Sequence, residues 1–476
     1  MQVPHSCKRE EGKELQNFAP DPELMGKTAV IVGYSARALN YLAKVTGLRT
    51  IVIDCFADMD LRRTADEFIH VDLDRQRNPE GKLENSAAYY LEKEMEYNKE
   101  KINNVDYVLL GSSFENDCES WQQASKYSNY LGNIPASAQN LRNPDTLYPF
   151  LLRNSISFPK TIVLKHDHDN FVYEIFDPMD SIGNSATNSV ESLKMLFEKI
   201  TELIPPPFVL KPSNSGGGLG IFLIHTLSDF LDKYRILHNI RKPPYLIQEY
   251  IQGVPMSCSF FADGKNAKAY TLSHQIIGEN RFGCKGLFTY CGNIMNETIS
   301  NPYNENNEKI FAQVDHIIQL STDFASLRGS NGLDFVLSQK RSLPQIVFME
   351  INPRFQGTMD LVLESTGQNI LQKHIQSIKK HHLPDDVCFL NEQTYMKVIY
   401  FSPIDFHIMV DLQGLDFRDV PLIGSFIPNS SPICTNFVIG DSIEDAYTKA
   451  FDDRDLMVKV LGLKSRIPDN DPFRKR

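Results

Sequence analysis

No pair of cysteines in this sequence has the two-residue spacing of a structural zinc site. The eight cysteines are scattered along the chain, which predicts reduced thiols in a cytoplasmic protein. Cys284 and Cys291 are too isolated in the sequence to suggest redox work. No apolar run approaches the ~18 residues of a membrane span. Residues 1–20 lack the apolar core of a signal peptide and predict a flexible arm, taken as residues 1–25.

Positive charge is also in short supply. The 476 residues include 49 Lys and Arg against 60 Asp and Glu, a formal net charge of −11. This balance argues against broad, non-specific binding to DNA or to an anionic membrane. Apolar residues make up 42% and charged residues 23% of the chain, which is typical of a folded globular protein.

Strand-like runs alternate with a helical pattern in residues 26–140. The runs lie at 27–33, 49–58 and 104–113, and a helix-like segment occupies 38–47. Such alternation predicts a parallel α/β domain. New units are expected at 141–375 and at 376–476, the latter a small α+β segment.

A glycine-rich loop separates two short apolar runs in VLKPSNSGGGLGIFLI, residues 209–224. The run after the glycines is strand-like, so a dinucleotide-binding turn, which needs a helix there, does not fit. A P-loop does not fit either, because Lys211 comes before the loop. The remaining interpretation is a β-hairpin whose backbone N–H groups close over phosphates. A plain flexible hairpin stays an open alternative.

A second motif, FMEINPRFQG at 348–357, places acidic residues inside an apolar strand. Glu350 and Asn352 share one face of this strand, because alternate residues do, and Arg354 follows. The run GLDFVL at 332–337 predicts an antiparallel neighbour that brings Asp334 to the same surface. Two carboxylates and an amide oxygen suit Mg²⁺. The alternative is a surface strand with solvated charges.

The motifs LKPSNSGGGLG, LIQEYIQG, GLDFVL and MEINPR, in this order, resemble the ATP-grasp superfamily. The resemblance implies ATP held between a glycine-rich lid at about 160–245 and a metal-binding lobe at about 252–375. DVPLIGSFIPNSSPICTNF near the C-terminus resembles the biotin-carboxylase branch. GYSARALNYLA, DCFADMDL, SSFEN, LRNPD and DGKNAKAYTLSHQIIG resemble a narrower group, the predicted ATP-dependent carboligases of methanogens and methylotrophs.

The resemblance also implies roles for individual residues. Lys211 would contact the ATP phosphates and Arg354 would stabilise the phosphate in transfer; both count as catalytic. The lid loop would be Gly216, Gly217 and Gly218, and the adenine hinge Gln248, Glu249, Tyr250 and Ile251. Asp334, Glu350 and Asn352 would bind Mg²⁺, or Mn²⁺ in its place.

Three positions depart from the family pattern. A second ATP-binding lysine is usual, and Pro144 stands at its place, with Arg142 nearby as a candidate substitute. Pro255 replaces a glutamate that often holds the ribose. Thr358 replaces the catalytic glutamate of biotin carboxylase, which argues against bicarbonate chemistry.

Substrate candidates follow the three strands of the N-terminal domain. Open α/β sheets bind ligands at the carboxyl ends of their strands. The candidates at that edge are Ser35, Arg37, Asp58, Asp60 and Glu115, with helix capping as the alternative. His274 and Gln275 are further candidates in the metal-binding lobe, with packing as their alternative.

These observations predict an ATP-dependent carboxylate–amine ligase that acts on small molecules in the cytoplasm, with a homodimer left open. Two alternatives remain: a carboxylase acting through carboxyphosphate, and a non-catalytic sensor that closes on ATP.

Overall fold

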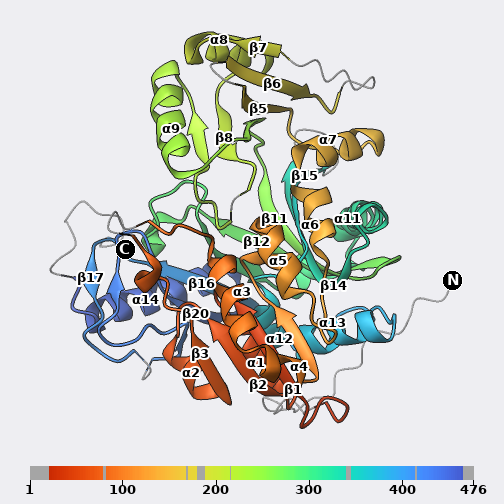
Figure 1. The fold of residues 1–476 in the computed structure, drawn as a ribbon, viewed down its shortest axis with the longest axis vertical. Coiled ribbons are helices and arrows are strands. Elements are labelled where there is room, and N and C mark those ends of the chain that lie inside the picture. The colour runs from red at the N-terminus through yellow and green to blue at the C-terminus, as the bar shows by residue number, and fades with distance from the viewer. Residues whose placement is uncertain are drawn as a thin grey trace.

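The structure is a computed structural model, and it describes residues 21–78, 82–167, 170–179, 188–214, 216–338, 345–412 and 415–464. The predicted N-terminal arm lies outside these residues, except for a turn over 21–26. The described chain forms an N-terminal sheet domain, a small lobe and a large antiparallel sheet (Figure 1). None of the described helices combines the length and hydrophobicity that a membrane span requires.

The N-terminal domain is a parallel four-stranded sheet in the order β3-β2-β1-β4. Its strands are β1 (Thr28–Gly33), β2 (Arg49–Asp54), β3 (Glu67–His70) and β4 (Tyr107–Leu110). Its helices are α1 (Arg37–Val45), α2 (Met59–Thr64), α3 (Ala87–Tyr97), α4 (Lys99–Asn103) and α5 (Cys118–Ala124), with short 3-10 turns η1 (Asp74–Gln76) and η2 (Phe114–Asn116). The apolar run of β1 is buried, as expected for a parallel strand covered on both faces.

Two helices lead from this domain to the next: α6 (Pro135–Arg142) and α7 (Pro144–Arg153). Both begin with proline, which suits a first helical turn because its missing N–H has no partner there.

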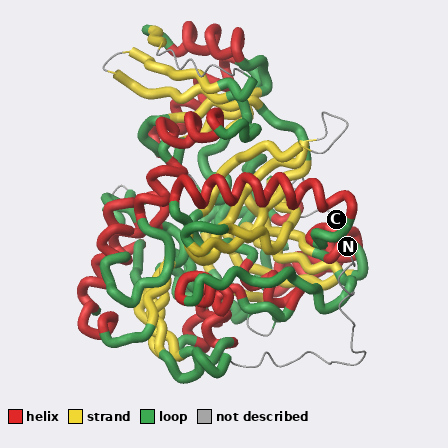
Figure 2. The backbone as a smooth tube through the Cα atoms, turned by 90° about the vertical axis from the view of Figure 1, so that its right-hand side faces the viewer, coloured by secondary structure: helices red, strands yellow, loops and turns green. Residues whose placement is uncertain are grey.

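The small lobe is an antiparallel sheet in the order β7-β6-β5-β10-β8-β9. Its elements are β5 (Thr161–Asp167), β6 (Asn170–Phe176), β7 (Asn188–Val190), α8 (Leu193–Leu203), β8 (Phe208–Pro212), β9 (Phe222–Ile224), α9 (Leu227–Ile240) and β10 (Tyr245–Glu249). Phe208, Phe230 and Tyr245 belong to a core of its own. The lobe lies at the top of Figure 1, and Figure 2 shows it set apart from the rest of the molecule.

The large sheet has eight strands in the order β15-β14-β11-β12-β13-β16-β20-β18. They are β11 (Val254–Asp263), β12 (Ala267–Ile277), β13 (Tyr290–Met295), β14 (Arg328–Ser338), β15 (Gln345–Asn352), β16 (Thr394–Phe401), β18 (Phe417–Arg418) and β20 (Pro432–Gly440). Strands β16, β18 and β20 come from residues after 375, so the C-terminal segment extends this sheet and forms no layer of its own. A separate two-stranded ribbon pairs β17 (Phe406–His407) with β19 (Phe426–Ile427).

Helices cover the large sheet and join it to the N-terminal domain. They are η3 (Asn280–Phe282), α10 (Glu297–Ser300), α11 (Glu305–Ala325), α12 (Met359–Thr366), α13 (Ile370–Lys379) and α14 (Ile443–Val460). Leu39 and Leu42 of α1 share a buried core with Leu361 and Leu363 of α12. The N-terminal domain is therefore packed firmly against the large sheet and its helices.

Candidate active site

The glycine-rich segment is a β-hairpin, as the sequence predicted. Phe208 of β8 pairs with Ile224 of β9 in antiparallel register. In the connecting loop Gly217 and Gly218 have φ angles of 63° and 81°, a region that residues with a side chain rarely adopt. Gly216 has an ordinary φ and open space around it.

The loop reaches across to the large lobe. The N–H of Tyr290, on β13, donates to the carbonyl of Gly217 at 3.2 Å. A Cβ on Gly218 would lie 1.9 Å from the carbonyl oxygen of Phe288, so only glycine allows this approach. The hairpin thus bridges the space between the two lobes.

Lys211 lies on β8 just before the loop and is half-buried. Burial lowers the pKa of Lys211, Glu350 acts against this by favouring the charged form, and Arg142 adds to the lowering. These three charges are therefore close enough to interact. Among the described residues, Lys211 has no ion-pair partner.

The two carboxylates of the predicted metal site face each other across neighbouring strands. Asp334 of β14 lies opposite Glu350 of β15, as the sequence predicted. Burial, followed by the charge of Glu350, raises the pKa of Asp334 to about 7. A divalent cation between them would relieve both effects, since it favours the ionised form of each carboxyl.

Asn352 and Gln275 complete the oxygen-rich group. Asn352 Nδ2 donates to Asp334 at 2.9 Å and to Glu350 at 3.2 Å, which places all three side chains together. Gln275 Nε2 donates to the other oxygen of Asp334 at 3.1 Å. Across the described residues, no cluster of three or more His, Cys, Asp or Glu side chains could hold a metal. The set is two carboxylates with amides, which fits Mg²⁺ because Mg²⁺ takes its other ligands from water and phosphate.

Arg142, at the end of α6, enters this group from the N-terminal side. Its Nη2 donates to Asn352 Oδ1 at 2.9 Å and its Nη1 to Asn116 Oδ1 at 3.0 Å. The structure thus brings to the site the arginine that the sequence offered as a substitute for the missing lysine. Its Nε atom is buried without a hydrogen-bond partner.

Arg354 follows β15 and forms an ion pair with Glu115, in the turn η2 after β4. Its Nη1 also donates to the carbonyl of Phe355 at 3.0 Å. Burial raises the pKa of the Glu115 carboxyl, but the positive charges of Arg354 and Arg142 outweigh it and hold that pKa below its ordinary value.

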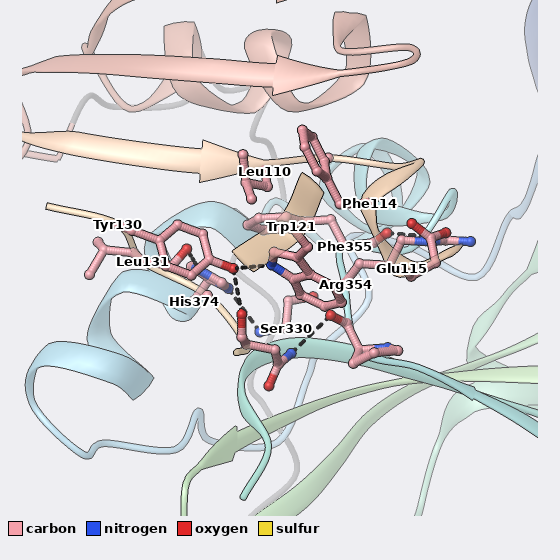
Figure 3. Close-up of a pocket in the computed structure, with 14 residues that line it drawn as sticks. Leu110, Phe114, Glu115, Trp121, Tyr130, Leu131, Ser330, Arg354, Phe355 and His374 are labelled. Carbon is pink, nitrogen blue, oxygen red and sulfur yellow. Dashed lines mark hydrogen bonds and ion pairs between the residues drawn. The ribbon is translucent and has the colours of Figure 1, made fainter. Parts of the chain in front are cut away.

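A small cavity borders this ion pair where the N-terminal domain meets the large lobe (Figure 3). Trp121 Nε1 donates to Tyr130, whose hydroxyl donates to the Asn133 carbonyl at 2.6 Å. The cavity measures about 20 Å³, room for about one water molecule. It is therefore too small to hold a substrate.

The hinge residues connect β10 to β11. The side chain of Gln248 points into the protein and donates to Tyr148 and Thr161. The Glu249 N–H donates to the Lys160 carbonyl. Tyr250 packs edge-on against Phe288, with ring centroids 6.4 Å apart. Ile251 follows at the crossing between the lobes, and the nucleotide roles of all four residues stay predictions.

The predicted substrate residues of the N-terminal domain take part in different contacts. Arg37 is 4% exposed, and its guanidinium donates to Asp360 at 2.9 Å and to Asp419 at 2.8 Å. Asp60 lies 3.7 Å from Arg37 and accepts hydrogen bonds from the backbone N–H groups of Asp419 and Val420. Glu115 has turned instead to Arg354.

Gln275 contacts Asp334, whereas within the described part of the chain the side chains of Ser35, Asp58 and His274 form no hydrogen bond or ion pair. Asp58 is 6% exposed at the start of α2, and burial followed by the charge of Asp419 raises its pKa. Ser35 is exposed in the turn after β1. His274, on β12, is half-buried, and burial lowers its pKa. Their substrate roles stay predictions.

Sequence reasoning missed the partners of Arg37. Asp360 is fully buried between Arg37 and Lys397, whose Nζ lies 2.8 Å from it, and Asp419 has a left-handed φ of 54°. These residues come from α12, β16 and the segment after β18, and no motif connects them. An aspartate among the apolar residues that begin the helix MDLVLEST was the one available signal.

Comparison with known proteins agrees with this geometry. Residues 182–358 match the ATP-grasp domain. No curated protein matches the chain in sequence. N5-carboxyaminoimidazole synthetase from Staphylococcus aureus, solved with ADP, aligns over 92% of this chain and 99% of its own, at 15% identity and a TM-score of 0.60.

Two further structures have the same arrangement. Biotin carboxylase from Campylobacter jejuni aligns over 91% of this chain and 92% of its own, at 13% identity and a TM-score of 0.63. L-amino acid ligase from Bacillus licheniformis aligns over 90% and 98%, at 14% identity and a TM-score of 0.60. The chain therefore has the ATP-grasp fold and carries an ATP-grasp domain. Biotin carboxylase is among its structural relatives, as the C-terminal motif predicted; the narrower methanogen and methylotroph resemblance stays a prediction.

Proposed function

We propose that this protein is an ATP-dependent carboxylate–amine ligase that forms ADP. The observation that supports this most is the meeting of three cations with one acidic pair. Lys211 and Arg354 come from different parts of the fold and both interact with Glu350. Arg142, from a third part, donates to Asn352, which donates in turn to Asp334 and Glu350. Such an arrangement suits a nucleotide polyphosphate with its divalent cation.

In this proposal the side chains hold and neutralise the reacting phosphate. Asp334, Glu350 and, once its amide has turned, Asn352 would hold Mg²⁺, which would supply positive charge against the phosphates. Lys211 and Arg142 bind the phosphate oxygens as positive charges. Arg354, held by Glu115, stabilises the charge that develops as the phosphoryl group moves.

The glycine loop provides backbone N–H groups to the phosphates and excludes water. Its contacts with Phe288 and Tyr290 keep it over the space between the lobes. A substrate carboxylate aligned with the γ-phosphate would become an acyl phosphate, which an amine then attacks with release of phosphate. Exclusion of water protects that intermediate from hydrolysis.

The acceptor substrates are assigned to the carboxyl edge of the N-terminal sheet. Ala57 and Ser113, with φ angles of 60° and 102°, lie in the loops after β2 and β4. Strained residues of this kind gather at binding and catalytic sites. The Asp54 carboxylate braces the edge, because it accepts hydrogen bonds from the N–H groups of Ala36, Phe56 and Ala57.

The carboxylase alternative has less support from the geometry. Thr358 occupies the place of a catalytic glutamate, and its hydroxyl is buried 3.1 Å from that of Ser259. The Thr358 hydroxyl is therefore already hydrogen-bonded in the protein interior, and it cannot replace a glutamate as a base. The structural relatives do not favour either reaction, since they include both an amino acid ligase and a biotin carboxylase.

The test is ADP production from ATP and Mg²⁺ with pools of carboxylates and amines. We expect release of ADP that needs both a carboxylate and an amine and does not need bicarbonate. ADP release that depends on bicarbonate would support the carboxylase instead. ATP binding without turnover in any pool would support the sensor.

A further inference from the structure

Two thiols lie in contact at either end of the segment that meets the glycine loop. We call residues 288–290 of that segment the platform, because Gly217 and Gly218 contact Tyr290 and Phe288. The Sγ atoms of Cys284 and Cys291 are 3.4 Å apart, and both residues are buried. Cys284 follows η3 and Cys291 is the second residue of β13. The chain between them, residues 285–290, folds back so that the two sulfurs meet, and the expectation that these cysteines are isolated was wrong.

The two thiols are not equivalent. The Cys291 thiol donates a hydrogen bond to the sulfur of Cys284. This contact lowers the pKa of Cys284 and raises the pKa of Cys291. Because the thiolate is the reactive form, Cys284 is the better nucleophile of the pair. The turn after Cys284, residues 285–287, is exposed, which gives a small oxidant a route to it when the turn opens.

The chain between the cysteines is the surface on which the lid loop rests. The Tyr290 N–H donates to Gly217, and the Phe288 carbonyl lies against Gly218. The Phe288 ring also packs on Tyr250 of the hinge. Any movement of this short segment is therefore passed directly to the lid and to the hinge.

We propose that Cys284 and Cys291 form an oxidation site, at which a peroxide converts the pair into a disulfide and loosens the glycine loop. The Cys284 thiolate attacks one peroxide oxygen, breaks the O–O bond and becomes a sulfenic acid, and water leaves. Cys291 then attacks that sulfur, the S–S bond forms, and the hydroxyl leaves as a second water. Two thiols lose two protons and two electrons, and hydrogen peroxide gains them.

Geometry explains why the disulfide disturbs the lid. A disulfide holds its sulfurs at about 2.05 Å, so the two sulfurs must approach each other by more than an ångström from their present 3.4 Å. The platform residues 288–290 lie within the loop that this bond closes. Gly218 lies so close to the Phe288 carbonyl that a shift of residue 288 would force the glycine loop to move as well. Losing the hydrogen bond to Gly217 and this packing should weaken nucleotide binding about tenfold.

The effect on nucleotide rests on the proposed ATP site, but formation of the disulfide does not. The experiment treats the folded full-length protein with hydrogen peroxide and maps its thiols by mass spectrometry without reduction. We expect a Cys284–Cys291 cross-link that a thiol reductant reverses. Hydrogen exchange of residues 216–221 should become faster in the oxidised protein, and Mg·ATP binding about tenfold weaker.

Three variants sharpen the test. Cys284→Ala and Cys291→Ala should each abolish the cross-link and the change in hydrogen exchange. Cys388→Ala removes an exposed thiol elsewhere and should respond as the unaltered protein does. Persistence of both free thiols in the treated protein, or a cross-link that leaves hydrogen exchange of the loop unchanged, overturns the inference. A cross-link that alters the loop in a protein that never binds ATP supports the inference and overturns the proposed function.

Discussion

The carboxylate of Glu115 forms an ion pair with the guanidinium of Arg354, and this pair joins the N-terminal sheet domain to the end of β15. Arg354 is the residue that we propose stabilises the phosphate in transfer. Its position therefore depends on a residue from a different domain.

Glu115→Gln should lower turnover by about tenfold to 100-fold while changing ATP affinity much less. The change keeps the shape but removes the charge that orients Arg354, as loss of a supporting group does elsewhere. Steady-state kinetics and nucleotide titration measure the two effects separately. Glu119→Gln, an exposed glutamate on the next helix, is the matched control. An equal loss of ATP affinity in Glu115→Gln would place its role in nucleotide binding.

Glu350→Gln should lower Mg²⁺-dependent turnover by about 100-fold, about 2.7 kcal/mol in the barrier. The melting temperature should stay the same or rise, since the change relieves repulsion with Asp334. ADP release and thermal melting measure these effects, and Glu308→Gln on the exposed surface of α11 is the control. Near-normal ADP release would show that Glu350 does not bind the metal.

Gly218→Ala and Gly216→Ala should differ sharply. A Cβ at 218 meets the Phe288 carbonyl and strains a left-handed φ, whereas a Cβ at 216 meets nothing within 4 Å. We expect the first change to weaken ATP binding about tenfold or more and the second to have little effect. Replacing Gly217 and Gly218 together with valine should reduce turnover far more than stability. Equal ATP affinity in all these variants would show the loop to be an ordinary hairpin.

Arg142→Ala should weaken ATP binding about tenfold, and Arg142→Lys should restore part of the loss. Lysine keeps the charge but cannot reach Asn352 and Asn116 at once, because it lacks the forked guanidinium. Nucleotide titration measures the effect, with the exposed Arg153→Ala as control. Unchanged affinity in Arg142→Ala would show that no residue substitutes for the missing lysine at this position.

Asp360→Asn should lower the free energy of unfolding by about 3 kcal/mol, because it removes the shared partner of two buried cations, Arg37 and Lys397. Glu364, on the same helix as Asp360, forms a less deeply buried ion pair with Arg418 of β18, and Glu364→Gln should cost about 1 kcal/mol or less. Denaturant unfolding gives both values. Similar costs for the two changes would contradict the importance of burial here.

The difference in unfolding free energy between wild type and Asp360→Asn should depend on pH in a defined direction. Burial alone would raise the pKa of Asp360, but Lys397 and Arg37 lower it below its ordinary value. A depressed carboxyl pKa stabilises the fold above the unfolded pKa of about 3.9 and loses that effect as pH falls through the folded value. The gap between wild type and Asp360→Asn should therefore be constant above about pH 5 and shrink only in stronger acid.

The sequence predicted elements whose signal is local. The hairpin around 209–224, the antiparallel pairing of 332–337 with 348–352 and the parallel strands at 28–33 and 49–54 all follow from short patterns. Strand β3 was missed, because EFIH is short and half polar. The strand order of the large sheet could not be read, since it depends on packing between distant segments.

Contacts between domains were also beyond the sequence. Arg37 pairs with residues more than 300 positions away, and Arg354 with one 239 positions away. An arginine after a β-strand looks alike whether it meets a substrate or an aspartate of another domain. The cysteine pair was missed for a different reason. Two cysteines seven residues apart can lie in contact or far apart, and the sequence does not show which path the turn between them takes.

The strand order of the large sheet has a consequence for synthesis of the protein. β16 lies beside β13, but the ribosome makes it about 100 residues later than β13. Until then the edge of β13, next to the lid platform, has no partner strand. A nascent chain that has completed all the proposed ATP-binding residues therefore still lacks strands β16, β18 and β20 of this sheet. Premature termination near 380 should yield an aggregation-prone fragment with no independent activity.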